Sequence, residues 1–276
     1  MKIYRHLAVV AVAAIMAFGA AAAQAKDWKV VKIGTEGAYP PFNELKPDGT
    51  LVGFDIDIAK ALCDQMKVKC ELVTQDWDGM IPALLAGKFD AIIASMSITP
   101  EREKKIAFSN KYYNTPPAIA VPKDSDLKVP NAGKMLDTVA VDKVLKGKIL
   151  GAQSSTTHAN YAQVHLPDAQ LKLYPTADEY KLDLGNGRLD AAIDDVVVLS
   201  QWLKSKDGDC CKLLGTLKID PKINGVGAGI GLRKGDTDLK KMFDDAIIAI
   251  RKNGTYKKIN DKYFDFDVYG SDDTNG

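Results

Sequence analysis

Two short segments, far apart in the sequence, share one pattern. Residues 87–95 read GKFDAIIAS and residues 187–195 read GRLDAAIDD. In each copy a helix is expected to end at glycine, a basic residue follows, and an apolar strand leads to a polar residue, Ser95 or Asp195. We therefore predict two α/β lobes built to one plan, each presenting the end of this strand to a shared cleft.

Strands alternate with helices through the first half of the chain. The apolar periodicity predicts, in order, a strand over 28–36, a helix over 51–66 that follows a short strand, a strand over 70–74, a helix up to 85 and a strand over 88–94. Within the first helix, Ile58, Leu62 and Met66 lie four apart and share a face. Such alternation predicts an α/β fold in which each lobe has a mostly parallel central sheet flanked by helices.

The second half repeats this alternation between two extended segments that suit crossovers. Prolines stiffen residues 112–117, and residues 218–230 are rich in glycine. Between and after them we expect helices near 139–145, 158–164, 180–184, up to 202, 238–252 and 256–263, with strands over 148–152 and up to 195. The predicted division is 26–114 with 226–276 for the first lobe, 118–217 for the second, and 114–118 with 217–226 for a two-strand hinge.

The first 25 residues are typical of a secretory signal peptide. Lys2 and Arg5 precede an apolar run over 7–23, and Ala-Gln-Ala at 23–25 suits cleavage before Lys26. A retained membrane anchor fits less well because the run is short. Without those two cations, the 37 basic residues become 35 against 36 acidic ones. No basic block stands out, so neither nucleic acid nor direct membrane insertion is expected, and the periplasm is the predicted compartment.

The four cysteines form two different pairs. Cys63 and Cys70 bracket the end of a predicted helix and the start of a strand, a spacing that favours a disulfide in an exported protein. Cys210 and Cys211 are adjacent, so they could be free, joined in a strained ring, or paired between molecules. No histidine cluster accompanies them, and we expect no metal site.

The segment IIASMSITPER (residues 92–102) has the composition of a ligand site. A buried strand ends here in Ser95 and Ser97, and Arg102 follows after a Thr-Pro turn. Strand ends of open α/β sheets are where polar ligands usually bind. The alternative is an ordinary strand that leaves the core through a serine-rich turn.

Several segments resemble the polar amino acid-binding proteins of bacterial ABC importers, in the branch for lysine, arginine, ornithine, histidine and opines. They are GTEGAYPPFN, LVGFDIDIAKALC, QDWDGMIPALLAGKFDAIIASMSITPEREKKIAFS, GRLDAAIDD and NGTYKKINDKYFDFDVYG. The resemblance covers nearly the whole mature chain. It implies the type II two-lobed periplasmic-binding-protein fold, an amino acid ligand without a cofactor, an inner-membrane ABC permease as partner, and a monomer.

The resemblance also implies a role for individual residues. Arg102 would bind the ligand α-carboxylate in a bidentate pair, and Thr156 with the start of its helix would hold the same group from the other lobe. The α-ammonium would be bound by Ser97, Asp195 and the carbonyl of Ser95.

The side chain of the ligand would lie between Tyr39 and Trp77, and Glu36 would face its distal cation. Residues 153–155 are expected only as lining. The full expected set is Glu36, Tyr39, Trp77, Ser95, Met96, Ser97, Arg102, Ala152, Ser155, Thr156 and Asp195.

Each role has an ordinary structural alternative. Glu36 could be a solvated strand-end carboxylate, Tyr39 and Trp77 could be core aromatics, and Arg102 could pair with a neighbouring glutamate on the surface. The sequence also departs from some relatives, with Ala94 in place of a serine, a longer segment over 124–146, and no counterpart for the adjacent cysteines.

Other functions remain open at this level. The protein could be a receptor for an opine, a ligand-sensing partner of a membrane receptor, or a dehydratase-like enzyme. Catalysis would require an acid or base over the ligand, for which Glu36 is the nearest candidate and His158 a distant second. No Ser-His-Asp or phosphate-loop pattern is present. We therefore expect an arginine-type binding protein and not an enzyme.

Overall fold

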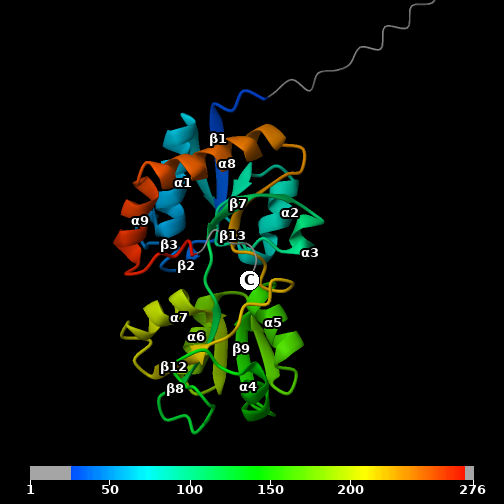
Figure 1. The fold of residues 1–276 in the computed structure, drawn as a ribbon, viewed down its shortest axis with the longest axis vertical. Coiled ribbons are helices and arrows are strands. Elements are labelled where there is room, and N and C mark those ends of the chain that lie inside the picture. Colours follow the sequence, from blue (N-terminus) through cyan, green and yellow to red (C-terminus); the bar gives the residue numbers. More distant parts are fainter. Residues whose placement is uncertain (1–25, 271–276) are drawn as a thin grey trace, which may run out of the picture.

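The computed structural model describes residues 26–270. They form two lobes, one above the other along the longest axis (Figure 1). The expected signal peptide, residues 1–25, lies outside the described residues.

The first lobe is built on a five-stranded sheet of order β5-β1-β6-β13-β7. β1 runs parallel to β5 and β6, whereas β13 is antiparallel to β6 and β7, so four of the five strands share one direction. The strands are β1 Val30–Thr35, β5 Lys69–Thr74, β6 Ala91–Ile92, β7 Ala107–Tyr113 and β13 Ala228–Leu232. A small antiparallel sheet lies beside them, formed by β2 Ala38–Tyr39, β3 Asn43–Leu45 and β4 Leu51–Val52.

The second lobe repeats this plan with the order β10-β9-β11-β8-β12. β9 is parallel to β10 and β11, and β8 is antiparallel to β11 and β12. The strands are β8 Pro117–Pro122, β9 Ile149–Gln153, β10 Gln170–Tyr174, β11 Ala191–Asp195 and β12 Cys211–Thr216. The predicted mostly parallel sheets are confirmed, each with one reversed strand.

Helices cover both faces of each sheet (Figure 1). In the first lobe α1, α8 and α9 pack on one side and α2 and α3 on the other; in the second, α6 and α7 lie opposite α4 and α5. Their bounds are α1 Phe54–Met66, α2 Met80–Leu85, α3 Pro100–Glu103, α4 Thr138–Val144, α5 Thr157–His165, α6 Ala177–Gly185, α7 Val196–Leu203, α8 Thr237–Lys252 and α9 Thr255–Tyr263, with a 3-10 turn at Trp77–Gly79.

The repeat occupies the same place in both lobes, since β6 and β11 are the third strands of their sheets. Gly87 and Gly187, which precede them, have φ angles of 76° and 68°, a region that favours glycine. Asp90 and Asp190 each accept a hydrogen bond from a backbone N–H of the adjacent strand, β1 or β9. The predicted common plan is therefore confirmed down to side-chain contacts.

The chain passes twice between the sheets, from β7 to β8 and from β12 to β13. One apolar cluster continues across this boundary through Tyr113, Ala118 and Ala228. β13 returns into the first sheet as an interior strand, which places the end of the expected second crossover, residues 228–230, in the core. The hinge limits at 114–118 and 217–226 stay a prediction.

Several elements differ from expectation. Leu51 and Val52 form β4, and the helix begins only at Phe54, because Gly53 has a φ of 127° that a helix does not accommodate. The strand predicted over 88–94 is paired only at Ala91–Ile92. β7, β8, β10 and β12 were not predicted; β10 has mostly exposed or half-buried side chains and lies at an edge of its sheet.

The two cysteine pairs are both joined in the structure. Cys63 at the end of α1 bonds to Cys70 on β5, with 6.1 Å between their Cα atoms, which confirms the prediction. Cys210 is bonded to its neighbour Cys211 at the start of β12. The ring form is therefore the one present among the three alternatives.

Gly53 fixes the loop that carries Tyr39. A Cβ on Gly53 would lie 2.2 Å from the carbonyl oxygen of Phe42, and the N–H groups of Phe54 and Asp55 donate to the carbonyls of Pro41 and Phe42. We expect Gly53→Ala to lower the free energy of unfolding by about 3 kcal/mol or more, because the clash involves backbone that cannot move aside.

Gly49→Ala is the matched control. Gly49 has a φ of 84° but no atom within 4 Å of the added Cβ, so this change should cost only about 1 kcal/mol of backbone strain. Urea unfolding of both variants would separate the effect of the steric clash from that of backbone strain. Equal losses of unfolding free energy in the two variants would contradict the role assigned to Gly53.

Candidate functional site

A polar cavity lies where the ends of strands from both lobes meet. Its empty space amounts to about 320 Å³, part of which is open to solvent. Its lining comes from the ends of β1 and β9, the segment after β6, and the starts of α3 and α5. The lining residues are Glu36, Tyr39, Trp77, Ala94, Ser95, Ser97, Arg102, Gln153, Thr156, Thr157 and His158.

Arg102 is a half-buried cation without an anionic partner. Thr99 caps the short helix α3, and Pro100 starts it, which turns the arginine into the cavity. Its guanidinium donates to the carbonyls of Ser97, at 3.0 Å, and Ser155, at 3.1 Å. Burial lowers the pKa of Arg102 to about 10, so the group is still charged at neutral pH.

No carboxylate within residues 26–270 lies within 4.0 Å of this guanidinium, so the alternative of a surface pair with Glu101 or Glu103 is not what the structure contains. A buried charge that is satisfied only by carbonyl dipoles is costly. Arg102 can therefore donate to an anionic ligand group, and a guanidinium binds a carboxylate in bidentate fashion.

Glu36 brings an acidic group to the same cavity. It follows the last residue of β1 and accepts a hydrogen bond of 2.6 Å from the amide of Gln153 in the second lobe. Burial raises the pKa of Glu36 to about 7, although the bond from Gln153 acts in the opposite direction. It is not the solvated carboxylate of the alternative interpretation, and a cation nearby would stabilise its charged form.

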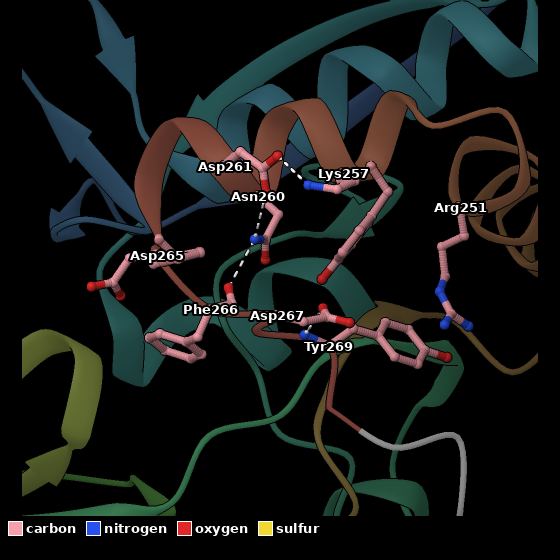
Figure 2. A pocket seen from close by; sticks show the side chains of 10 residues that line it. Arg251, Lys257, Asn260, Asp261, Asp265, Phe266, Asp267 and Tyr269 are labelled. Atoms are coloured by element: carbon pink, nitrogen blue, oxygen red, sulfur yellow. Dashed lines mark hydrogen bonds and ion pairs between the residues drawn. The ribbon is translucent and has the colours of Figure 1, made fainter.

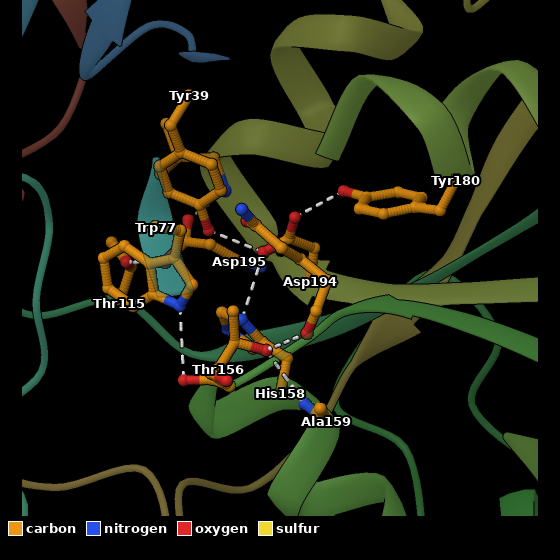
Figure 3. Close-up of polar contacts among 12 residues, drawn as sticks. Tyr39, Trp77, Thr115, Thr156, His158, Ala159, Tyr180, Asp194 and Asp195 are labelled. Atoms are coloured by element: carbon orange, nitrogen blue, oxygen red, sulfur yellow. Dashed lines mark hydrogen bonds and ion pairs between the residues drawn. The ribbon is translucent and has the colours of Figure 1, made fainter. Parts of the chain in front are cut away.

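Tyr39 and Trp77 lie beside these charges. The Tyr39 hydroxyl donates to Asp194 of the second lobe at 2.5 Å, and the Trp77 indole donates to the carbonyl of Ser155 at 3.2 Å (Figure 3). Trp77 also lies 5.3 Å from the Arg102 guanidinium. Both aromatics line the cavity, as expected, and each is tied to the opposite lobe.

Ser95 is held in an unusual conformation by a buried network. Its φ is 55°, its hydroxyl donates to Asp55 at 2.9 Å, and its N–H donates to the hydroxyl of Tyr112. Asp55 also accepts from Asn43 and Tyr112, each at 2.8 Å. Because the hydroxyl of Ser95 is already engaged, its carbonyl is the group left for a ligand, in line with the expected role.

Asp195 faces an adjoining cavity shared with Tyr39, Ser95 and Ser97. Its carboxylate accepts from the N–H of Val197, as the cap of α7, and from the hydroxyl of Thr115. Burial raises its pKa to about 6. It therefore lies near Ser95, with which the repeat pairs it.

Of the expected residues, Met96, Ala152 and Ser155 do not line the cavity, and Thr156 lines it at the start of α5. Met96 and Ala152 are buried in the apolar cores of their lobes, because alternate strand residues point to opposite faces. Ser155 offers its carbonyl, and the Thr156 hydroxyl caps α5 by accepting from the N–H of Ala159. Their contribution to ligand binding stays a prediction.

Sequence reasoning missed Asp194 and undervalued Gln153, Thr157 and His158. Asp194 is one of two consecutive aspartates at the end of β11, and strand alternation assigns only Asp195 to the cleft. His158 received attention only as a distant candidate for catalysis, yet its Nδ1 lies 3.1 Å from Asp194. The signal available in the sequence was that the segment GRLDAAIDD ends in two aspartates, Asp194 and Asp195, and not in one.

A larger hollow lies away from the strand ends. Figure 2 shows it beside α9 and the segment after it, lined by Arg251, Lys257, Phe266, Tyr269 and their neighbours. Its cations are already engaged, since Lys257 pairs with Asp261 and Arg251 lies 3.4 Å from the ring centre of Tyr269. None of the expected site residues lines it, so we place the site between the lobes.

Two further observations concern residues 26–270 only. They contain no group of three or more His, Cys, Asp or Glu side chains arranged to hold a metal ion. None of their helices combines the length and apolar character needed to cross a bilayer.

Two similar lobes joined by two crossings, with a charged cavity between them, define a two-lobed α/β binding protein. The profile of the bacterial extracellular solute-binding proteins, family 3, matches residues 31–266, and the chain belongs to this family.

Named relatives are similar over most of their length. The L-arginine-binding protein of Pseudomonas aeruginosa is 46% identical over 246 residues, covering 88% of this chain and 91% of that protein. The histidine-binding periplasmic protein of Salmonella typhimurium is 40% identical over 260 residues, covering 93% and 96%. The solved structure of a Salmonella typhimurium periplasmic binding protein described for high arginine specificity has a TM-score of 0.75 at 30% identity, covering 86% of this chain and 99% of that one.

Proposed function

We propose that this protein is the substrate-binding component of an ABC importer and captures a cationic L-amino acid, with L-arginine favoured. The observation that carries this proposal is a pair of unmatched charges in one cavity. Arg102 has no anionic partner, Glu36 is an acid without an ion pair within residues 26–270, and no ion pair joins the two. A zwitterion with a cationic side chain supplies both missing partners.

The α-carboxylate of the ligand would bind Arg102 and the first turn of α5. The α-ammonium would lie near the carbonyl of Ser95, with Ser97 and Asp195 beside it. The aliphatic stem would run past Tyr39 and Trp77, so that its distal cation reaches Glu36. The ligand would thus be held by both lobes, and its binding would favour the closed arrangement.

The remaining steps of the proposal concern export and delivery. Residues 1–25 would be cleaved as a signal peptide, leaving a monomer in the periplasm that presents its closed form to the inner-membrane permease. Receptors for opines would share the backbone contacts and differ around Glu36. A dehydratase-like enzyme would need that same acid for proton transfer.

Arg102→Ala should raise the Kd for L-arginine about 100-fold or more, because a buried ion pair loses one partner. Isothermal titration calorimetry on the purified protein would measure it. Lys105→Ala, at an exposed position three residues further on, is the control and should bind as the wild type does. Equal affinities for Arg102→Ala and the wild type would refute the carboxylate assignment.

Glu36 should make cation binding depend on pH. With a pKa of about 7, Glu36 is mostly neutral at pH 5.5 and mostly charged at pH 8.5, and only the charged form attracts a distal cation. Glu36→Gln is neutral throughout. The Kd of Glu36→Gln for L-arginine divided by that of the wild type should therefore grow as the pH rises from 5.5 to 8.5. A ratio that stays constant would place the distal cation elsewhere.

Native mass spectrometry of the protein exported to the periplasm tests compartment and ligand class together. We expect a mature chain that begins at Lys26 and carries a cationic amino acid, which is released on denaturation. A co-purified opine would select the alternative receptor. Conversion of added L-arginine into another species during incubation would select the enzyme.

A further inference from the structure

Asp194 lies behind the cavity, near the end of β11, and is almost fully buried. Its carboxylate accepts hydrogen bonds from Tyr39, at 2.5 Å, and from Tyr180, and it is paired with His158 at 3.1 Å (Figure 3). Tyr39 and His158 line the cavity, whereas Asp194 does not. Asp194 is thus positioned to act on a ligand through its partners.

The partners of Asp194 come from both lobes. Tyr39 belongs to β2 of the first lobe, and Tyr180 and His158 belong to α6 and α5 of the second. We propose that Asp194 is a positioning residue that latches the closed lobes by accepting a hydrogen bond from the hydroxyl of Tyr39, while His158 pairs with the same carboxylate from within the second lobe. This inference rests on the proposed function only in assuming that the lobes close on a ligand.

The charges around Asp194 favour its ionised form. Burial disfavours a carboxylate, but the attraction of His158 and the bonds from His158 and the two phenols outweigh it and lower the pKa of Asp194. Burial likewise disfavours a charged imidazole, yet the attraction of Asp194 raises the pKa of His158.

Other charges face this pair from the neighbouring elements. Asp195 also favours a charged His158, whereas Arg102 opposes it. Glu36, at the end of β1, feels the negative charge of Asp194. The ion pair of Asp194 and His158 therefore lies between Glu36 and Arg102, the two charged residues that we assign to ligand binding.

A phenol that donates to an ionised carboxylate forms a stronger bond than a neutral pair does. The bond between Tyr39 and Asp194 exists only while the lobes are together, because its two ends lie in different lobes. The bond from Tyr180 to the same carboxylate lies within the second lobe and is independent of closure. The two tyrosines therefore form a matched pair of probes.

Tyr39→Phe and Tyr180→Phe each remove one hydroxyl from Asp194 and keep the ring. We expect Tyr39→Phe to speed L-arginine dissociation about tenfold, the effect of a lost bond to a charged group, and Tyr180→Phe to change it less than about twofold. Stopped-flow fluorescence would measure both rates. Equal effects of the two variants, or no effect of Tyr39→Phe, would overturn the latch.

The role of His158 has a test that needs no ligand. His158 and His165 are the only histidines after residue 25, so proton NMR with His165→Gln as the assignment variant can follow the titration of His158. Asp194→Asn should lower the pKa of His158, and an unchanged titration would overturn the ion pair.

These measurements also separate this inference from the proposed function. If the wild type does not bind L-arginine, the proposed function fails, and the latch is judged by small-angle X-ray scattering of the free protein. Tyr39→Phe should then have a larger radius of gyration than Tyr180→Phe, and equal radii would overturn the latch.

Discussion

The half-buried guanidinium of Arg102 connects the two lobes directly. Its two hydrogen bonds go to backbone carbonyls, one from each lobe, through Ser97 and Ser155. Carbonyl dipoles satisfy donors but do not neutralise charge, so Arg102 keeps a positive charge without an anionic partner. Closing the lobes and binding a carboxylate are then parts of one event, because each makes the other less costly.

The two lobes share a plan but contribute differently to the site. Asp90 and Asp190 have the same structural role, since each accepts a hydrogen bond from a backbone N–H of the neighbouring strand. The two segments differ at their last residue. Ser95 has a positive φ and presents its carbonyl, whereas Asp195 caps α7 with its carboxylate. The repeat therefore fixes where the strand ends lie, and the residues after it determine the chemistry.

The sequence predicted those features that depend on local periodicity. The repeat and the alternation of strands and helices predicted both sheets, and the strand end with Ser95 and Arg102 predicted the cavity. Edge strand β10 escaped prediction because its side chains are mostly exposed, and the start of α1 was misplaced because Gly53 interrupts an otherwise helical pattern. Asp194 could not be found this way, since its partners Tyr39 and His158 are 155 and 36 positions away and meet it only through tertiary packing.

The proposed preference for a ligand with a cationic side chain follows from the environment of the Glu36 carboxylate. Glu36 accepts a hydrogen bond from the neutral amide of Gln153, which does not compensate the charge of the carboxylate. Burial therefore raises the pKa of Glu36 to about 7. A neutral ligand would leave this cost in place or require Glu36 to take up a proton, whereas a ligand cation removes the cost. In the proposed function, the discrimination between cationic and neutral ligands therefore arises from the cost of burying the charge of Glu36, which a ligand cation would remove.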